Sequence, residues 1–243
     1  HCVSDHLHRV RTLSLMSSNV FDGDDQKRNV VVKVGMIGDS QAGKTSLMVK
    51  YIENRFDEDY IQTLGVNFME KTITIRNLEI SFSIWDLGGQ KEYLHMLPLV
   101  CNGAVVLLFM FDLCRKPSLT AIKQWYRQAR KVNETAVPFL IGCKYDVFAK
   151  MDPQSQEDIT RQARKFARAM KAPLIFCSSS HSINIKKIFK IAISKVFHLK
   201  CNVPEVNTVG QPIIEYSSSH KRKPSSVPSQ NSSSERVEKS NRS

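Results

Sequence analysis

The sequence predicts an α/β fold with a six-stranded, mostly parallel sheet and helices on both faces. One observation behind this prediction is that apolar, β-branched runs of strand length alternate along the chain with segments of helical periodicity. A second is that two neighbouring runs alternate apolar and polar residues across a tight turn, as a β-hairpin does. Strands that alternate with helices at this spacing favour a parallel sheet with right-handed crossovers.

The strand and helix pattern covers residues 30–200, and we expect one folded domain there. Residues 1–29 are polar and aperiodic, and residues 201–243 are rich in Ser, Pro and Lys. Compositions of this kind cannot bury an apolar core, so we expect a disordered tail at each end of the domain.

The first predicted strand ends in a glycine-rich loop whose spacing is typical of phosphate binding. Residues 30–37 are apolar and β-branched, as in a buried parallel strand, and residues 38–45 fit the pattern G-x-x-x-x-G-K-[ST]. Residues 46–51 follow with helical spacing, so the loop leads into a helix whose first N–H groups converge on an anion. A chance match in an ordinary strand–turn–helix unit is the alternative, which the correct flanks disfavour.

The residue types within this phosphate loop (residues 38–45) indicate nucleotide chemistry. Gly38 and Gly43 allow backbone conformations that a side chain would block. Lys44 would reach the β- and γ-phosphate oxygens, and the Thr45 hydroxyl would ligate Mg²⁺. The residues expected to contact the phosphates are Gly38, Ser40, Gln41, Ala42, Gly43, Lys44, Thr45 and Ser46.

A long, acidic connection follows at residues 54–65, and loops of this length are usually functional or mobile. We then expect a hairpin of strands 66–75 and 78–85, with Arg76 and Asn77 in the turn. The second strand closes in D-x-x-G followed by Gln, at residues 86–90. Asp86 would hold a Mg²⁺-bound water, and Gly89 would let a backbone N–H approach the terminal phosphate. An ordinary glycine-rich turn is the alternative, which the distance from the phosphate loop disfavours.

The remaining elements continue the alternation. We expect strands at residues 103–112, 137–143 and 173–177, and helices at residues 118–131, 153–171 and 183–197. The apolar faces of the first two helices would hold Leu119, Ile122, Trp125 or Tyr126, and Ala129, and then Ile159, Ala163, Phe166, Ala167 and Met170. The predicted motifs all fall at the carboxyl ends of strands, so one site can use them together.

The net charge of +12 is concentrated in one part of the chain. Residues 115–200 hold 18 Lys/Arg and 5 Asp/Glu, whereas residues 1–114 hold 11 and 14. Solvated helix faces would explain this excess, and a docking surface for an acidic scaffold or an anionic membrane is the alternative. No nucleic-acid-binding motif is present, so we expect no nucleic-acid partner. The six cysteines lack metal-ligand spacing, and no apolar run approaches the roughly 18 residues of a membrane helix, so we expect a reduced, cytoplasmic compartment.

Taken together, these residues resemble a Ras-superfamily small GTPase over residues 30–200. The strongest likeness is to the septum-promoting, mitotic-exit GTPase family of fungi and related eukaryotes. Residues 56–71, residues 84–90 and residues 138–146 carry this likeness. The resemblance implies a P-loop NTPase fold of the Ras type, GTP and GDP as ligands, Mg²⁺ as cofactor, and hydrolysis of GTP to GDP.

The resemblance also implies roles for individual residues. Thr63 would ligate Mg²⁺ through its hydroxyl and contact the γ-phosphate through its N–H, so that its loop is ordered only with GTP. Phe56 would pack edge-on against guanine, and Asp146 would accept hydrogen bonds from guanine N1–H and the 2-amino group. The Lys144 stem would cover the base, and Gln90 would orient the attacking water.

The implied site therefore has three parts. The catalytic residues are Gln90, Lys44 and Thr63, and the Mg²⁺ ligands are Thr45, Thr63 and Asp86. Beyond the phosphate loop, the implied nucleotide contacts are Phe56, Tyr60, Thr63, Gly89, Lys144, Asp146, Ser178 and Ser179.

Two positions depart from the general small-GTPase pattern. Cys143 stands where an Asn usually braces the phosphate loop, and a thiol is only a weak donor. Residues 178–180 read Ser-Ser-Ser where Ser-Ala-Lys is usual, although the backbone N–H can still meet guanine O6. We therefore expect weaker nucleotide affinity and faster intrinsic exchange than in a typical Ras-like protein.

Intrinsic hydrolysis is expected to be slow. No Arg occupies the phosphate loop or residues 56–65, and Arg55 lies too far from the transferred phosphate to act on it. An Arg supplied in trans is worth about 10³–10⁵ in rate, so we expect dependence on a GTPase-activating protein.

The resemblance implies a molecular switch in mitotic exit, septation and cytokinesis, with a protein-kinase effector at the spindle pole body, a microtubule-organising centre. The chain ends without a prenylation box, so we expect a monomer attached through a scaffold protein rather than a lipid anchor. A nucleotide-bound scaffold with negligible turnover is the alternative, and Gln90, Thr63 and Asp86 argue against it. A third reading, a P-loop nucleoside or nucleotide kinase, would need an Arg-bearing lid and an acceptor pocket, neither of which the sequence shows.

Overall fold

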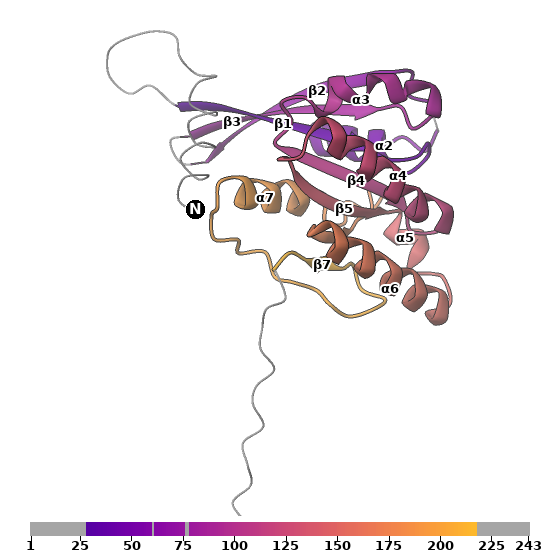
Figure 1. Cartoon of the computed structure of the whole chain (residues 1–243). Helices are drawn as coiled ribbons and strands as arrows, with labels where there is room; N and C mark the ends of the chain where they lie inside the picture. Colours follow the sequence, from indigo (N-terminus) through magenta and orange to yellow (C-terminus); the bar gives the residue numbers. More distant parts are fainter. Residues whose placement is uncertain (1–27, 60, 76–77, 218–243) are drawn as a thin grey trace, which may run out of the picture.

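A computed structural model describes residues 28–59, 61–75 and 78–217, which form a sheet flanked by helices (Figure 1). The sheet has seven strands in the order β2-β3-β1-β4-β5-β6-β7. The strands are β1 (Arg28–Ile37), β2 (Val66–Ile75), β3 (Leu78–Leu87), β4 (Val106–Asp112), β5 (Val137–Cys143), β6 (Leu174–Phe176) and β7 (Ile214–Glu215). The helices are α2 (Lys44–Glu53), the 3₁₀ helix η1 (Lys91–Met96), α3 (Leu97–Cys101), α4 (Lys116–Val132), α5 (Tyr145–Phe148), α6 (Pro153–Met170) and α7 (Ile185–Val196).

The centre of the sheet is parallel, and this arrangement positions the site. β1 pairs in parallel with β3 and β4, β4 with β5, and β5 with β6. β2 and β7 add antiparallel strands at the two edges. Because parallel strands end on the same side of a sheet, the segments that follow β1, β3, β5 and β6 come together there. This is the right-hand side of Figure 1, where α5 lies.

Apolar side chains hold helices on both faces of the sheet, as predicted. On one face, α2 and α7 pack over β1, β3 and β5, and the Tyr51 and Phe189 rings stack with centroids 3.6 Å apart. On the other face, α3, α4 and α6 cover Phe109, Phe111 and Phe176. Every residue of β4 is buried, which is typical of a central parallel strand. The predicted α/β fold is confirmed.

The two long amphipathic helices follow the predicted pattern closely. In α4, Trp125 is 6% exposed and is the core residue, whereas Tyr126 is only partly buried. Pro153 begins α6, where the missing N–H costs nothing. The Asp152 carboxylate caps this helix by accepting a hydrogen bond from the Ser155 N–H at 2.8 Å. In these two helices the apolar period and the residues typical of helix ends therefore indicate the elements that the structure contains.

The predicted domain end at residue 200 and the predicted count of six strands are wrong. Residues 201–217 pack on the domain and supply β7, which pairs with β6. Ile213 and Ile214 are fully buried, and Glu215 forms an ion pair with Arg164 at 2.6 Å. A two-residue strand in a Pro-rich segment has no detectable period, because its order comes from contacts made elsewhere in the fold.

Several smaller boundaries also differ from the prediction. β1 begins at Arg28, so the last two residues of the predicted N-terminal tail belong to the sheet, and β3 extends to Leu87. The short elements η1, α3 and α5 have no counterpart in the prediction. Residues 1–27 and 218–243, for which disorder is predicted, and the predicted turn at Arg76 and Asn77 lie outside the described residues. Within the described part of the chain, no helix combines the length and apolarity needed to cross a bilayer.

Candidate nucleotide-binding site

The phosphate loop connects β1 to α2, as the sequence predicts. Its backbone enters the left-handed region at Gln41 and Gly43, with φ of 62° and 91°. A Cβ on Gly38 would lie 2.1 Å from Met110 O in β4. Glycine is therefore required at residue 38 by close backbone approach and at residue 43 by the positive φ.

Lys44 is enclosed by this loop. Its Nζ donates hydrogen bonds to Gly38 O at 2.9 Å and to Asp39 O at 3.0 Å, and the residue is 5% exposed. Burial lowers the pKa of the ammonium group, and the carboxylates of Asp86 and Asp39 oppose that shift. A buried positive charge thus lies inside the loop, where phosphate oxygens are expected.

Thr45, Thr63 and Asp86, here called the hydroxyl–carboxylate cluster, meet beside Lys44. Thr45 Oγ1 lies 2.7 Å from Thr63 Oγ1 and donates to Asp86 Oδ2 at 2.5 Å. Thr63 Oγ1 donates to the same carboxylate oxygen at 3.5 Å. These three residues come from α2, from the loop before β2 and from the end of β3, so the fold brings together side chains distant in the sequence.

The cluster fits a Mg²⁺ ion. Its three groups are hard oxygen donors, and Mg²⁺ prefers few protein ligands because it retains waters and substrate phosphates. Asp86 is fully buried, and its Oδ1 has no hydrogen-bond partner. Burial raises the pKa of Asp86, against the smaller opposing effects of Lys44 and the two hydroxyls. Among the described residues, no group of three or more His, Cys, Asp or Glu forms a metal cage, so this mixed cluster is the metal-site candidate that the predicted motifs define.

The segment after β3 closes against the phosphate loop. Gly88 N–H donates to Gly65 O at 2.7 Å. A Cβ on Gly89 would lie 2.1 Å from Ser40 N, so no side chain fits between the two segments. Gln90 is half-buried and occupies the position before η1, where its side chain makes no capping hydrogen bond. Gly89 and Gln90 are therefore placed near the phosphate loop, while their contacts with phosphate and water stay predictions.

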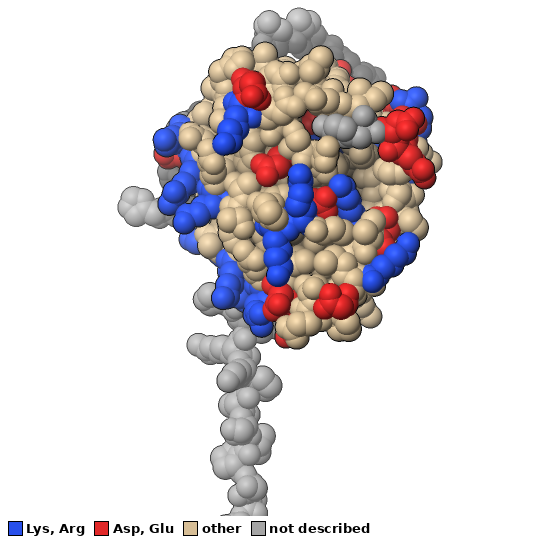
Figure 2. All heavy atoms as spheres, turned by 90° about the vertical axis from the view of Figure 1, so that its right-hand side faces the viewer, with Lys and Arg blue, Asp and Glu red and all other residues tan. Residues whose placement is uncertain are grey.

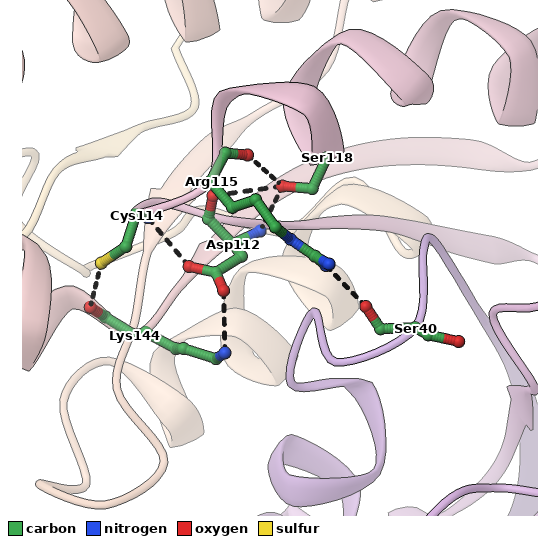
Figure 3. A network of polar contacts seen from close by, with 6 residues as sticks. All are labelled: Ser40, Asp112, Cys114, Arg115, Ser118 and Lys144. Atoms are coloured by element: carbon green, nitrogen blue, oxygen red, sulfur yellow. Dashed lines mark hydrogen bonds and ion pairs between the residues drawn. The ribbon is translucent and has the colours of Figure 1, made fainter.

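The loop after β5 carries the predicted base-binding lysine. Lys144 adopts a left-handed conformation with φ of 62°, and its Nζ forms an ion pair with Asp112 Oδ2 at 2.7 Å (Figure 3). The Tyr145 N–H donates to Cys177 O at 3.0 Å. This bond joins the loop after β5 to the segment after β6, so both segments line the same end of the sheet.

Asp146 and the serine run both approach His181. The Asp146 Oδ2 atom is 3.7 Å from His181 Nδ1. The Ser178 hydroxyl accepts a hydrogen bond from the His181 N–H at 3.1 Å and lies 3.0 Å from Ser180 Oγ. Ser178 is fully buried and Ser179 is half-buried. The predicted base-recognition residues are thus neighbours, and their hydrogen bonds to guanine stay predictions.

The acidic loop at residues 54–65 supplies the remaining predicted contacts. Phe56 is half-buried in it, and its packing against guanine stays a prediction. Tyr60 lies outside the described residues. Arg55 forms ion pairs with Glu53 at 3.2 Å and with Asp57 at 3.4 Å. These ion pairs lie at the exposed end of α2 and the start of the loop, and the expectation that Arg55 does not act on the phosphates stays a prediction.

Some residues that contact the site lie outside the predicted motifs. Asp112 forms an ion pair with Lys144. Its position as a charged residue at the end of an apolar strand is the sequence signal that could have indicated a role in the site. Arg115 Nη2 donates to Ser40 O at 2.5 Å, and Trp125 Nε1 donates to Asp39 Oδ1 at 2.7 Å. The sequence gives no signal for these two contacts, because Trp125 has the spacing of an ordinary core residue and Arg115 that of a helix-end residue.

The fold and the site define a phosphate-loop nucleotide-binding protein. A model of the Ras family matches residues 33–198, well over half of the chain, so the chain belongs to the Ras family and is a small GTPase, a GTP-hydrolysing enzyme. The predicted superfamily, P-loop fold and enzyme class are confirmed.

Individual relatives place the chain more narrowly. It is 66% identical to Septum-promoting GTP-binding protein 1 of Schizosaccharomyces pombe over 193 residues, which cover 79% of this chain and 98% of that protein. It is 26% identical to Ras-related protein SEC4 of Saccharomyces cerevisiae over 202 residues, covering 83% of this chain and 88% of that protein. It is 29% identical to Ras-related protein Rab-25 of Homo sapiens over 177 residues, covering 72% and 81% of the two chains.

Proposed function

We propose that this GTPase is a molecular switch that controls septation. The observation that carries the proposal is that Thr63, from the loop between α2 and β2, reaches Thr45 Oγ1 at 2.7 Å. A loop joined to the phosphate site through one side chain is held with GTP and released after hydrolysis. The relative that shares 66% identity is a septum-promoting GTP-binding protein by name, which supports septation as the process.

In the proposed reaction, the phosphate loop and Lys44 hold the phosphate chain of GTP. Thr45, Thr63 and Asp86 would hold Mg²⁺, which would neutralise charge on the phosphate chain when bound. Gly89 donates its N–H to the terminal phosphate, and Gln90 orients the attacking water. Asp146 accepts hydrogen bonds from guanine N1–H and the 2-amino group, a donor pair that adenine lacks.

The proposal includes a GTPase-activating protein that donates an Arg in trans. Arg55 is engaged by Glu53 and Asp57, and Arg115 by the backbone of the phosphate loop. In the described structure both guanidinium groups thus have partners within the protein, and we propose that neither supplies the catalytic Arg. An Arg from a partner is worth about 10³–10⁵ in rate, so intrinsic hydrolysis is slow and the partner sets the lifetime of the GTP form.

The downstream part of the proposal rests on the family resemblance. The GTP form recruits a protein-kinase effector and signals mitotic exit and cytokinesis through a kinase cascade. The protein acts in the cytoplasm, at the spindle pole body, where a scaffold protein attaches it. The 66% identity to Septum-promoting GTP-binding protein 1 supports septation as the process, and the effector, the cascade and the spindle-pole attachment rest on the resemblance alone.

The basic side of the domain is the surface proposed for an acidic part of that scaffold. The α4 sequence contains five Lys/Arg residues and no Asp or Glu. Four of these residues are exposed along the helix: Lys116, Lys123, Arg127 and Lys131. Figure 2, which looks onto the end of the molecule that carries α5, shows Lys and Arg side chains gathered on its left and centre. Opposite charge would guide an acidic partner to this side.

Single-turnover hydrolysis of bound GTP by the full chain, with Gln90→Leu as the control, tests the switch. The proposal predicts slow but measurable hydrolysis that Gln90→Leu lowers further. The alternative, a nucleotide-bound scaffold with negligible turnover, is motivated by Cys143 and Ser180, which depart from the usual motifs. Equal and negligible rates for the two proteins would favour that alternative.

Affinity capture tests the signalling part of the proposal. Gln90→Leu loaded with GTP is compared with the wild-type protein loaded with GDP. The proposal predicts a protein kinase enriched on the GTP form. Identical partners on both forms would contradict it, because a switch must present different surfaces in its two states.

A further inference from the structure

Arg115 crosses from the β4–α4 connection to the phosphate loop (Figure 3). Its Nη2 donates to Ser40 O at 2.5 Å, although the two residues are 75 positions apart in the sequence. The guanidinium Nε is buried and has no hydrogen-bond partner. The side chain is half-buried, with its Nε withdrawn from solvent and its Nη2 directed at the loop backbone.

The turn that holds Arg115 is itself fixed. The Ser118 hydroxyl donates to Arg115 O at 2.7 Å and accepts a hydrogen bond from the Asp112 N–H at 3.0 Å. Ser118 is 1% exposed, so these bonds are shielded from water. Figure 3 shows Ser118 bridging the start of α4 and the end of β4. The side chain of Arg115 thus starts from a rigid point.

A second contact comes from the same helix. Trp125 is 6% exposed, and its Nε1 donates to Asp39 Oδ1 at 2.7 Å. Asp39 and Ser40 are neighbours in the phosphate loop, so α4 engages two consecutive loop residues. The rest of α4 is anchored in the core by Leu119 and Ile122, which makes it a fixed support.

The phosphate loop needs a support for two reasons, the left-handed backbone at Gln41 and the weak hydrogen-bonding capacity of Cys143. Gln41 is a non-glycine residue at φ of 62°, a conformation that persists only where the surroundings impose it. The Cys143 side chain lies where the family's Asn usually braces the loop, within 3.2 Å of a Cβ built on Gly43. Its thiol is 4.0 Å from Cys177 Sγ and can donate only weakly.

We propose that Arg115 and Trp125 are positioning residues that brace the phosphate loop from α4 and replace the amide brace that Cys143 cannot supply. This inference rests on the nucleotide site of the proposed function. It adds that these two contacts control how fast the site releases its nucleotide. A hydrogen bond from a charged donor to a buried carbonyl corresponds to roughly 10- to 100-fold in an equilibrium constant. Loss of the Arg115 contact therefore accelerates nucleotide release by about that factor.

Release of a fluorescent GDP from the full chain tests the proposal. Arg115→Ala is expected to release GDP about 10- to 100-fold faster than the wild-type protein. Arg115→Lys keeps a charged donor and is expected to restore part of the difference. Gln124→Ala, on the exposed side of α4, is the matched control and is expected to release GDP at the wild-type rate.

A rescue experiment separates bracing from a general loss of structure. Cys143→Asn supplies the amide that is usual in the family, so Arg115→Ala combined with Cys143→Asn is expected to release GDP more slowly than Arg115→Ala alone. In the wild-type protein, where Arg115 still braces the loop, Cys143→Asn is expected to slow GDP release less than it does in Arg115→Ala. If Arg115→Ala fails to fold, the same comparison is made with Arg115→Lys.

The contact of Trp125 is tested by a double-mutant cycle. Trp125→Phe keeps an apolar ring and removes the N–H, and Asp39→Ala removes the acceptor. The two effects on GDP release are expected to be non-additive, because both changes break the same bond. Additive effects of the two substitutions on GDP release would contradict the proposed role of Trp125.

Two outcomes would overturn the proposal as a whole. One is wild-type GDP release from Arg115→Ala, and the other is no rescue by Cys143→Asn. If the first outcome came with a fall in single-turnover GTP hydrolysis, Arg115 would instead act on the phosphate itself. Failure of the wild-type protein to bind any guanine nucleotide would instead contradict the proposed function, so the two failures are distinguishable.

Discussion

Ile213→Ala tests whether residues 201–217 are part of the domain. Ile213 is fully buried, and its carbonyl accepts a hydrogen bond from the Phe176 N–H at 2.9 Å. Shortening a fully buried Ile to Ala removes apolar contact and leaves a cavity, which costs about 2–5 kcal/mol of unfolding free energy. In a domain of this size each kcal/mol lowers Tm by roughly 2–4 °C, so we expect a fall of about 5–20 °C.

Urea unfolding of the full chain measures this effect. The midpoint is expected to fall while the slope m stays unchanged, because the surface exposed on unfolding is nearly the same. Nucleotide and Mg²⁺ concentrations are held constant, since bound ligand adds stability. Val209→Ala is the matched control: it lies in the same segment and is 37% exposed, so we expect a change within about 0.5 kcal/mol. Equal midpoints for the two variants would refute the packing of this segment.

Three further predictions concern the site. Gly43→Ala is expected to weaken GDP binding by roughly tenfold, because the left-handed conformation costs an L-residue about 1–2 kcal/mol and the new Cβ would lie 3.2 Å from Cys143 Cβ; titration calorimetry measures this. Gly103→Ala, with φ of 68° and no atom within 4 Å of the new Cβ, is its control and should leave the affinity unchanged. Chelation of Mg²⁺ by EDTA is expected to speed GDP release by about tenfold or more, because the hydroxyl–carboxylate cluster is proposed to hold that ion beside the phosphates; Asp86→Asn should be less sensitive to EDTA, and equal sensitivity would contradict the assignment. Alkylation of Cys114 by iodoacetamide, followed by mass spectrometry, should be slow although the residue is exposed, because burial of the thiol and the nearby Asp112 charge raise its pKa to about 11 from 9.0. At pH 8 the thiolate fraction of Cys114 is about 100-fold lower than that of a free thiol. A thiolate of higher pKa is more nucleophilic, which offsets part of this difference, so we expect an alkylation rate roughly tenfold below that of a free thiol. The rate should rise with pH up to about pH 11.

The parts of the fold with a strong local pattern could be predicted from the sequence. The phosphate loop has a fixed spacing, and β5 is a continuous apolar run whose predicted bounds, residues 137–143, match those observed. The predicted apolar face of α4 is the buried face, because the 3.6-residue period reports which side meets the sheet. The predicted motifs come together for the same reason, since parallel strands end on one side of a sheet.

The parts that depend on contacts between distant segments could not be predicted. β7 is two residues long, and it is ordered by pairing with β6 and by burial of Ile213 and Ile214. Arg115 and Trp125 reach the phosphate loop because β4 lies beside β1 in the sheet, a neighbour relation that sequence order does not reveal. The Lys144–Asp112 ion pair arises in the same way, from the pairing of β4 with β5.

The central claim is that Lys44, the hydroxyl–carboxylate cluster and Asp146 enclose one guanosine phosphate. Displacement of a fluorescent GDP from the full chain by GTP or ATP, in the presence of Mg²⁺, tests it most directly. A site built to hydrogen-bond the guanine edge rejects a base that lacks those donors by about 10⁴-fold, so GTP should displace the probe at concentrations where ATP has no effect. Equal displacement by the two nucleotides would contradict the claim.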